Sequence, residues 1–221
     1  MDAFETVVAG MLSQQGYWVW PSYKVKLTKR EKSQIGRASS PRWEIDLVAY
    51  RGATNQILAV ECKSFLDSRG VTLRALTDAD TRFAVRFKLF HDATLRRVVL
   101  SRLARQLIEV KACAPKPVVQ LCLAAGRVAT AEDRKGLHKH FAKKRWQFWD
   151  EKWIGDCLER MAASGYQNDV ATIVAKLTLR TRRYEAGDAT DNVKLSVKPH
   201  RTPRCIPIRR DPLVMPVRRQ S

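Results

Sequence analysis

Residues 41–65 read PRWEIDLVAYRGATNQILAVECKSF, and the pattern of this stretch decides the fold. Apolar and polar residues alternate from Trp43 to Tyr50, a short polar segment follows, and a second apolar run begins at Ile57. Alternation with a period of two is typical of a half-buried strand, and the polar segment is typical of a turn. We therefore predict two strands joined as a hairpin.

Three charged residues interrupt the predicted strands. Asp46 lies in the middle of the first strand, and Glu61 and Lys63 lie at the end of the second. Residues two apart in a strand point to the same face, and strands joined by a hairpin usually pair side by side. We therefore expect Asp46 near Glu61 and Lys63. Charges on a half-buried sheet are costly unless they pair with each other or bind something.

Asp46, fourteen intervening residues and then Glu61-Cys62-Lys63 resemble the metal-binding signature of the PD-(D/E)XK nucleases, the restriction-endonuclease-like superfamily. Ile45 stands where this family often has a proline. The resemblance implies an α/β fold with an α-β-β-β-α-β core, in which helices flank a mixed central sheet. The alternative is a structural ion pair between Glu61 and Lys63, with Asp46 as a polar residue near the turn.

The resemblance also implies a site and a reaction. Asp46, Glu61 and the backbone carbonyl of Cys62 would hold Mg²⁺ or Mn²⁺, because such hard ions prefer oxygen ligands. Lys63 would orient the attacking water or stabilise the transition state. The reaction would hydrolyse a phosphodiester of nucleic acid and leave a 5′-phosphate, with DNA as the expected substrate and internal cleavage favoured. In related nucleases an acid on the first helix joins the site, and Glu5 is placed for that role.

The first helix leaves the role of Glu5 open. Residues 2–15 show the apolar spacing of an amphipathic helix, and Glu5 shares a face with Val8 and Leu12 at the border of the apolar stripe. Asp2 and Glu5 also have the spacing of a capping box, in which Glu5 would serve the helix N-terminus. Both roles are carried forward.

The charge of the chain favours a polyanionic partner. The 221 residues include 41 Lys and Arg against 22 Asp and Glu, a net charge of +19. Residues 186–221 contribute +5, so +14 belongs to the rest of the chain. Such an excess indicates nucleic acid as the first candidate partner. Two other classes stay open: a nucleic-acid-binding protein with the nuclease fold but no turnover, and a structural protein that associates with a larger assembly.

Several residues are candidates for contact with nucleic acid. The polar, basic segment 28–41 is expected to be a loop beside the site. In many nucleases of the resembled group a glutamine of the helix predicted over 92–112 belongs to the active site, and Gln106 is available. Phe83, Phe87 and Phe90 could stack on bases, although their spacing favours one buried helix face. The candidate contacts are Lys29, Arg30, Lys32, Arg37, Arg86, Arg96 and Gln106.

Other features indicate a reduced, cytoplasmic protein. The five cysteines are odd in number and form no C-x-x-C pair, which favours free thiols over disulfides or a zinc site. His138 and His140 are two apart on a predicted helix, so their side chains diverge and are poor joint ligands. No signal peptide or membrane span is expected. The sequence is compatible with a monomer or a homodimer.

The remaining chain is expected to complete the α/β fold. Residues 117–125 have the continuous apolar character of a buried strand, and 145–149 predict a short one. Thr130 and Asp150 have the character of helix caps. The domain boundaries predicted from these patterns are 1–125 for the nuclease-like core, 126–185 for an α/β extension packed on it, and 186–221 for a basic, proline-rich tail that is extended or disordered.

Overall fold

The predicted hairpin is present in the computed structural model, which describes residues 2–36, 42–78, 81–165 and 167–185. Strand β2 (Trp43–Arg51) and strand β3 (Gln56–Lys63) pair in antiparallel fashion around the 3₁₀ turn Gly52–Thr54. Arg37 and the predicted tail, 186–221, lie outside the described residues.

The other elements follow the predicted order closely. The other strands are β1 (Trp18–Val25), β4 (Val118–Ala125) and β5 (Gln147–Trp149). The helices are α1 (Ala3–Gln14), α2 (Lys29–Gln34), α3 (Leu73–Thr77), α4 (Thr81–Arg86), α5 (Lys88–His91), α6 (Ala93–Glu109), α7 (Ala131–Lys144), α8 (Glu151–Ala163) and α9 (Val170–Glu185).

The five strands form one mixed sheet in the order β1-β2-β3-β4-β5. Neighbours among β1, β2 and β3 are antiparallel, whereas β4 runs parallel to β3 and β5 runs parallel to β4. The chain leaves β3 and returns to β4 through α3–α6, because parallel neighbours require a long crossover. The predicted α/β class, with helices flanking a mixed sheet, is confirmed.

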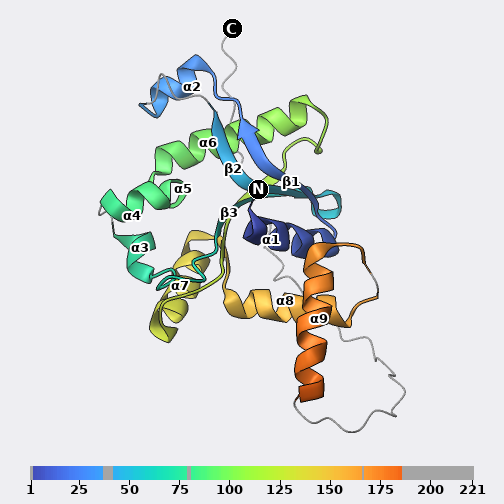
Figure 1. The fold of residues 1–221 in the computed structure, drawn as a ribbon. Coiled ribbons are helices and arrows are strands. Elements are labelled where there is room, and N and C mark those ends of the chain that lie inside the picture. The colour runs from blue at the N-terminus through green and yellow to red at the C-terminus, as the bar shows by residue number, and fades with distance from the viewer. Residues whose placement is uncertain (1, 37–41, 79–80, 166, 186–221) are drawn as a thin grey trace.

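Helices cover both faces of the sheet (Figure 1). On one face Val8 and Leu12 of α1 pack against Leu47 and Leu58 of the hairpin. On the other face α6 and α7 pack against β3 and β4, and the residues of this second cluster include Ile57, Leu103, Leu107, Leu121 and Phe141. The apolar alternation of β2 and β3 therefore supplies a core to both layers.

Residues 126–185 continue the same body. Strand β5 extends the sheet beside β4, and Met11 of α1 packs in one cluster with Ile154 and Met161 of α8. Thr130 and Asp150 cap α7 and α8 through their side chains, as predicted. In the described part of the chain, no helix has both the length and the apolar character to cross a membrane.

Three local predictions were wrong. Residues 29–34 form helix α2 rather than a loop, because Thr28 and Glu31 make a capping box at its N-terminus. The segment with Phe87 and Phe90 is split into the short helices α4 and α5, so it is not a single helix, although both rings are buried. Aromatic spacing alone did not reveal the break at Phe87.

The third wrong prediction is a core stripe of apolar residues on the helix expected over 168–180, which is α9 in the structure. The apolar residues Val170, Ile173, Val174 and Leu177, which have the spacing of a core stripe, are exposed. The helix instead buries Ala171 and Ala175 against α8 and α1. Small residues let helix backbones approach closely, and this close packing outweighs the larger hydrophobic residues on the opposite face.

Candidate active site at the carboxyl end of β3

The candidate site lies where β2 and β3 part. The ladder between them runs from Arg51 and Gln56 to Leu47 and Val60 and then stops. One residue further along, the side chain of Asp46 takes over. Its Oδ2 accepts a hydrogen bond of 2.7 Å from the backbone N–H of Cys62. A carboxylate thus replaces a backbone acceptor at the position where the sheet opens.

Strand β2 is irregular at Asp46. Leu47 and Ala49 belong to the cluster under α1, whereas Val48 and also Ile45 belong to the cluster on the opposite face. Strict alternation would place Ile45 on the same face as Leu47. In the ladder with β1, the position opposite Asp46 is held by Ser22, whose φ of 47° is unusual for a residue other than glycine.

Glu61 and Lys63 form an ion pair at the end of β3. The distance from Lys63 Nζ to Glu61 Oε1 is 2.7 Å. The side chain of Lys63 is 22% exposed and that of Glu61 is 19% exposed. They are therefore largely removed from water while a polar edge stays accessible to a ligand. The prediction that the two residues are neighbours is confirmed.

The site is an electrostatic cluster of three acids and one lysine. Burial raises the pKa of Glu61, and the charges of Asp46 and Glu5 raise it further, against the opposing effect of Lys63. Burial alone would lower the pKa of Lys63, but Glu61 and Asp46 outweigh burial and raise it. Lys63 therefore remains an ammonium, and the three acids together place an excess of negative charge around it.

Glu5 caps α1 and is also affected by the charge of Asp46. Its N–H donates to Asp2 Oδ1 at 2.8 Å, and its own Oε2 accepts from the N–H of Asp2 at 3.0 Å. The capping box is therefore present. Burial also raises the pKa of Glu5, and the charge of Asp46 adds to this rise. The capping carboxylate thus lies within the field of the site.

Cys62 contributes its backbone rather than its thiol. The side chain is buried in the cluster under α1, and burial with three nearby acids raises the thiol pKa far above its ordinary value. In a strand the N–H and C=O of one residue point to the same side. Because the N–H of Cys62 points to Asp46, its carbonyl also lies on the β2 side of β3.

A close contact between strand ends holds the backbone of the site. The N–H of Gly126 donates to the carbonyl of Lys63 at 2.9 Å. A Cβ atom at Gly126 would lie 2.4 Å from the carbonyl oxygen of Ser64. Only glycine allows this approach, so β4 fixes the chain directly after Lys63.

The donor set suits a hard divalent cation, because the carboxylates of Asp46 and Glu61 and the carbonyl of Cys62 are all oxygen ligands. Their excess negative charge, with the raised pKa of Glu61, is the electrostatic condition in which such a cation is favourable. Among the described residues, no group of three or more His, Cys, Asp and Glu side chains is arranged as a metal site. Asp46 and Glu61 instead have partners within the protein.

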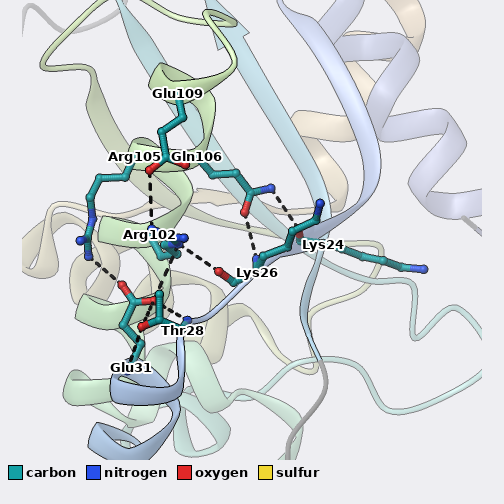
Figure 2. Close-up of polar contacts among 8 residues, drawn as sticks. All are labelled: Lys24, Lys26, Thr28, Glu31, Arg102, Arg105, Gln106 and Glu109. Carbon is teal, nitrogen blue, oxygen red and sulfur yellow. Dashed lines mark hydrogen bonds and ion pairs between the residues drawn. The ribbon is translucent and has the colours of Figure 1, made fainter.

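A second charged cluster, which we call the Glu31 clamp, fixes α2 to α6 (Figure 2). The clamp consists of Thr28, Glu31, Arg102 and Arg105. Glu31 is 7% exposed and lies 2.8 Å from Arg105 and 3.7 Å from Arg102. It also accepts from the N–H and the hydroxyl of Thr28. Despite its burial, these donors lower the pKa of Glu31.

Gln106 and Arg96 lie outside the candidate site and have structural partners. Gln106 accepts from the N–H of Lys26 at 2.9 Å and donates to the carbonyl of Lys24, so it holds the end of β1 on α6 (Figure 2). Arg96 donates to the carbonyls of Leu89 and Phe90.

The other candidate contacts are arranged on α2 and α4. Lys29 and Arg30 are exposed on α2, Lys32 is half-buried beside them, and Arg86 is exposed at the end of α4. The clamp that positions α2 was not predicted from the sequence. The signal was available, because Thr28 and Glu31 have the same capping-box spacing that was recognised at Asp2 and Glu5.

The remaining cysteines and histidines agree with their predictions. Cys62, Cys113, Cys122 and Cys157 are free thiols. The side chains of His138 and His140 diverge. His138 Nε2 lies 2.9 Å from Asp150 Oδ2, whereas the ring of His140 lies beside Trp146.

No family model, curated protein or solved structure matches this chain. The arrangement of its own residues must therefore carry any functional conclusion.

Proposed function

We propose that this chain is a metal-dependent nuclease that hydrolyses phosphodiester bonds of nucleic acid, with DNA as substrate and internal cleavage as the mode. One observation carries the proposal: Glu5, Asp46, Glu61 and Lys63 share one electrostatic cluster where β2 and β3 part. Three acids around one lysine are poorly explained by stability, because burial and mutual repulsion both act against them.

The order of the elements supports the proposal. A helix, an antiparallel meander of three strands, a helical crossover and a parallel fourth strand follow one another from α1 to β4. Apart from the short helix α2 between β1 and β2, this order is similar to the α-β-β-β-α-β core that the motif implies. The candidate residues also lie at the carboxyl end of β3, and in open α/β sheets this end of parallel strands is the usual location of ligand sites.

The metal would be held by the carboxylates of Asp46 and Glu61 and the carbonyl of Cys62, with Glu5 adding negative charge nearby. When bound, Mg²⁺ or Mn²⁺ supplies an acidified water and neutralises charge on the phosphate. To bind the metal, Glu61 would exchange its ion pair with Lys63 for the cation. Before that, the ion pair holds both side chains at the end of β3.

Lys63 acts as a donor rather than as a base. Its raised pKa keeps the ammonium protonated at neutral pH, so it can donate to a phosphate oxygen or orient a water but cannot accept a proton. The Lys63 side chain is largely buried and paired with Glu61, so its ammonium group has little conformational freedom. An oriented donor of this kind stabilises charge that develops in the transition state.

The test compares two acids of the same strand. Asp46→Asn removes the carboxylate that bridges β2 and β3, and Glu44→Gln changes an exposed acid two residues away. We expect the Asn variant to lose Mg²⁺-dependent cleavage of supercoiled and linear DNA and most of its metal affinity by calorimetry, while the Gln variant keeps both. Circular dichroism verifies that both variants are folded.

Two results would overturn the proposal. One is an Asp46→Asn variant that cuts as fast as Glu44→Gln. The other is a wild-type protein that cuts no single-stranded, double-stranded, branched or methylated DNA, and no RNA, with Mg²⁺ or Mn²⁺. In the second case, retained binding to nucleic acid would point to a non-catalytic protein with this fold.

A further inference from the structure

A cavity of about 410 Å³ lies at the opposite end of the sheet from the candidate active site. It is lined by the first turns of α6, the last turn of α7 and the start of β4, including Val119. Val119 is six residues before Ala125, which pairs with Lys63. At about 3.3 Å per residue, the two sites are roughly 20 Å apart along the strand. The cavity is therefore separate from the acidic cluster.

The lining of the cavity is strongly basic. Four of its side chains are cationic, namely Arg96, Arg97, Lys144 and Arg145, and none is acidic. Arg96 is already engaged by backbone carbonyls and by the ring of Trp146. Within the described residues, the side chains of the other three form neither an ion pair nor a hydrogen bond. These three side chains are exposed, so the positive charge of the lining is not neutralised by a partner in the described part of the chain.

The positive charge also affects the pKa of His140, whose ring lies beside Trp146 of the cavity. Burial lowers the pKa of His140, and the charges of Lys144, His91 and Lys143 lower it further. Basic residues at the last turn of a helix are often explained by the helix dipole. That explanation does not account for Arg97, which reaches the same cavity from the beginning of another helix.

The backbone at Arg145 is a further unusual feature. The residue ends α7 with φ 58° and ψ 33°, a left-handed conformation in which glycine is the usual residue. An arginine there retains a cation at the mouth of the cavity against the backbone preference. Lys111 at the end of α6 shares this conformation and therefore provides a matched comparison outside the cavity.

We propose that this cavity binds the terminal phosphate of a nucleotide, either a free nucleotide or the end of a nucleic-acid chain. Guanidinium groups match the geometry of phosphate oxygens, and lysine adds a point charge. The volume is that of a small-molecule site rather than of a single ion. Leu100 and Val119 provide an apolar wall against which a base can pack. The proposal does not depend on the nuclease activity.

The binding experiment uses calorimetry on the full chain in EDTA, so that a metal site cannot contribute. The probes are inorganic phosphate, adenosine monophosphate, and a short single-stranded oligonucleotide with either a 5′-phosphate or a 5′-hydroxyl. Tighter binding of the 5′-phosphorylated strand than of its 5′-hydroxyl counterpart identifies a chain end as the ligand. Binding of the mononucleotide without that difference identifies a free nucleotide.

A matched pair of variants tests the location. Arg145→Gly removes a cation of the cavity, and Lys111→Gly removes an exposed cation with the same backbone conformation, φ 57°, at the end of α6. Because glycine suits both positions, neither variant should lose thermal stability. We expect Arg145→Gly and Arg97→Ala each to weaken binding of the preferred probe about tenfold. Lys111→Gly should bind as the wild type does, and Lys63→Ala should weaken binding less than Arg145→Gly does.

Three outcomes would overturn the proposal. The wild type could bind none of the four probes at millimolar concentration. The Arg145→Gly variant could bind as tightly as Lys111→Gly. Finally, Lys63→Ala could weaken the binding as much as Arg145→Gly does, which would assign the phosphate to the site at β3 instead.

Discussion

Two buried glutamates in this molecule have opposite surroundings. Glu31 in the clamp accepts hydrogen bonds from Thr28 and ion pairs with two arginines, and its pKa is lowered. Glu61 at the end of β3 has one lysine partner and two acidic neighbours, and its pKa is raised. Both carboxylates are largely withdrawn from water. Burial raises the pKa of both carboxyl groups, but only at Glu31 do the surrounding donors and arginines outweigh it and favour ionisation.

The difference separates a structural ion cluster from a candidate functional one. In the clamp, the buried carboxylate of Glu31 has hydrogen-bond and ion-pair partners. These contacts hold the polar helix α2 against α6. The cluster at β3 keeps unfavourable neighbours together, which is typical of active sites where stability is lower than it could be. Variants of the two clusters should therefore have opposite effects on activity and on stability.

The largest contrast is expected in catalysis. Lys63→Ala and Arg105→Ala each remove a cation that pairs with a buried glutamate. We expect Lys63→Ala to lower the single-turnover cleavage rate by roughly 10²–10³-fold, as is typical when one oriented donor that stabilises transition-state charge is lost. Metal affinity should not fall, because an ammonium is not a metal ligand and its loss frees Glu61 to bind the metal. Arg105→Ala should cut within about twofold of the wild type, and an equal loss in both variants would remove the contrast.

The next contrast is in stability. Glu31→Gln should lower the free energy of unfolding by about 1–3 kcal/mol, because it weakens hydrogen bonds to charged groups at a buried position. Glu61→Gln should leave this free energy unchanged or raise it at pH 7, because the neutral side chain no longer opposes Asp46 and Glu5. Urea denaturation at pH 7 measures both values. A Glu61→Gln variant less stable than Glu31→Gln would show that the acidic cluster is structural.

The same pair should differ in its dependence on pH. The folded pKa of Glu31 lies below its ordinary value of 4.5, so its contribution to stability is present above pH 4.5 and is lost as pH falls through the folded pKa. The folded pKa of Glu61 lies above 4.5, so stability declines as pH rises from 4.5 through the folded pKa. Urea midpoints from pH 3 to pH 8 should show the first slope disappear in Glu31→Gln and the second in Glu61→Gln. Unchanged slopes would contradict the assigned charges.

A smaller effect is expected for the binding of DNA. Lys29 and Arg30 are exposed on α2, and the clamp fixes this helix against α6. Replacing both with alanine should reduce the slope of log affinity against log salt by about 2, because each phosphate contact contributes about 0.9. Fluorescence anisotropy across salt concentrations measures the slope. The double variant of Lys135 and Lys139, two exposed lysines of α7, is the control. An identical change there would mean that only net charge matters.

The smallest effect is expected at Glu5. Glu5→Gln keeps an oxygen that can accept the capping hydrogen bond, so stability should change by less than about 0.5 kcal/mol. It also removes a negative charge from the field of Asp46 and Glu61. We expect metal affinity to fall a few-fold in calorimetry. An unchanged affinity would leave Glu5 as a cap alone.

The sequence predicted the parts of the fold that depend on local pattern. Asp46, Glu61 and Lys63 could be grouped because hairpin pairing and two-residue spacing are geometric rules. The helix caps at Thr130 and Asp150 could be predicted because capping depends on a residue type next to the start of a helix. The end of the β2–β3 ladder at Leu47 could not be predicted, because it depends on the pairing of β2 with both β1 and β3.

Other features depend on tertiary contacts that no local pattern contains. Ala171 and Ala175 are buried in one cluster with Met11 of α1 and with residues of α8. The basic cavity joins Arg97 to Lys144 and Arg145 through the packing of α6 and α7 on one sheet. In the sequence these residues belong to separate helices with ordinary surface charge, so nothing there brings them together.

The hairpin described above also has a consequence for the order of folding. The contacts between β2 and β3 join residues five to thirteen positions apart, whereas those between β3 and β4 join residues 62 apart. Short loops close first, because the entropy cost of closure rises with loop length. Asp46, Cys62 and Lys63 therefore belong to the part of the chain that can organise earliest, and the basic cavity belongs to the last. During refolding, protection of the Cys62 amide from hydrogen exchange should appear before the capacity to bind phosphate.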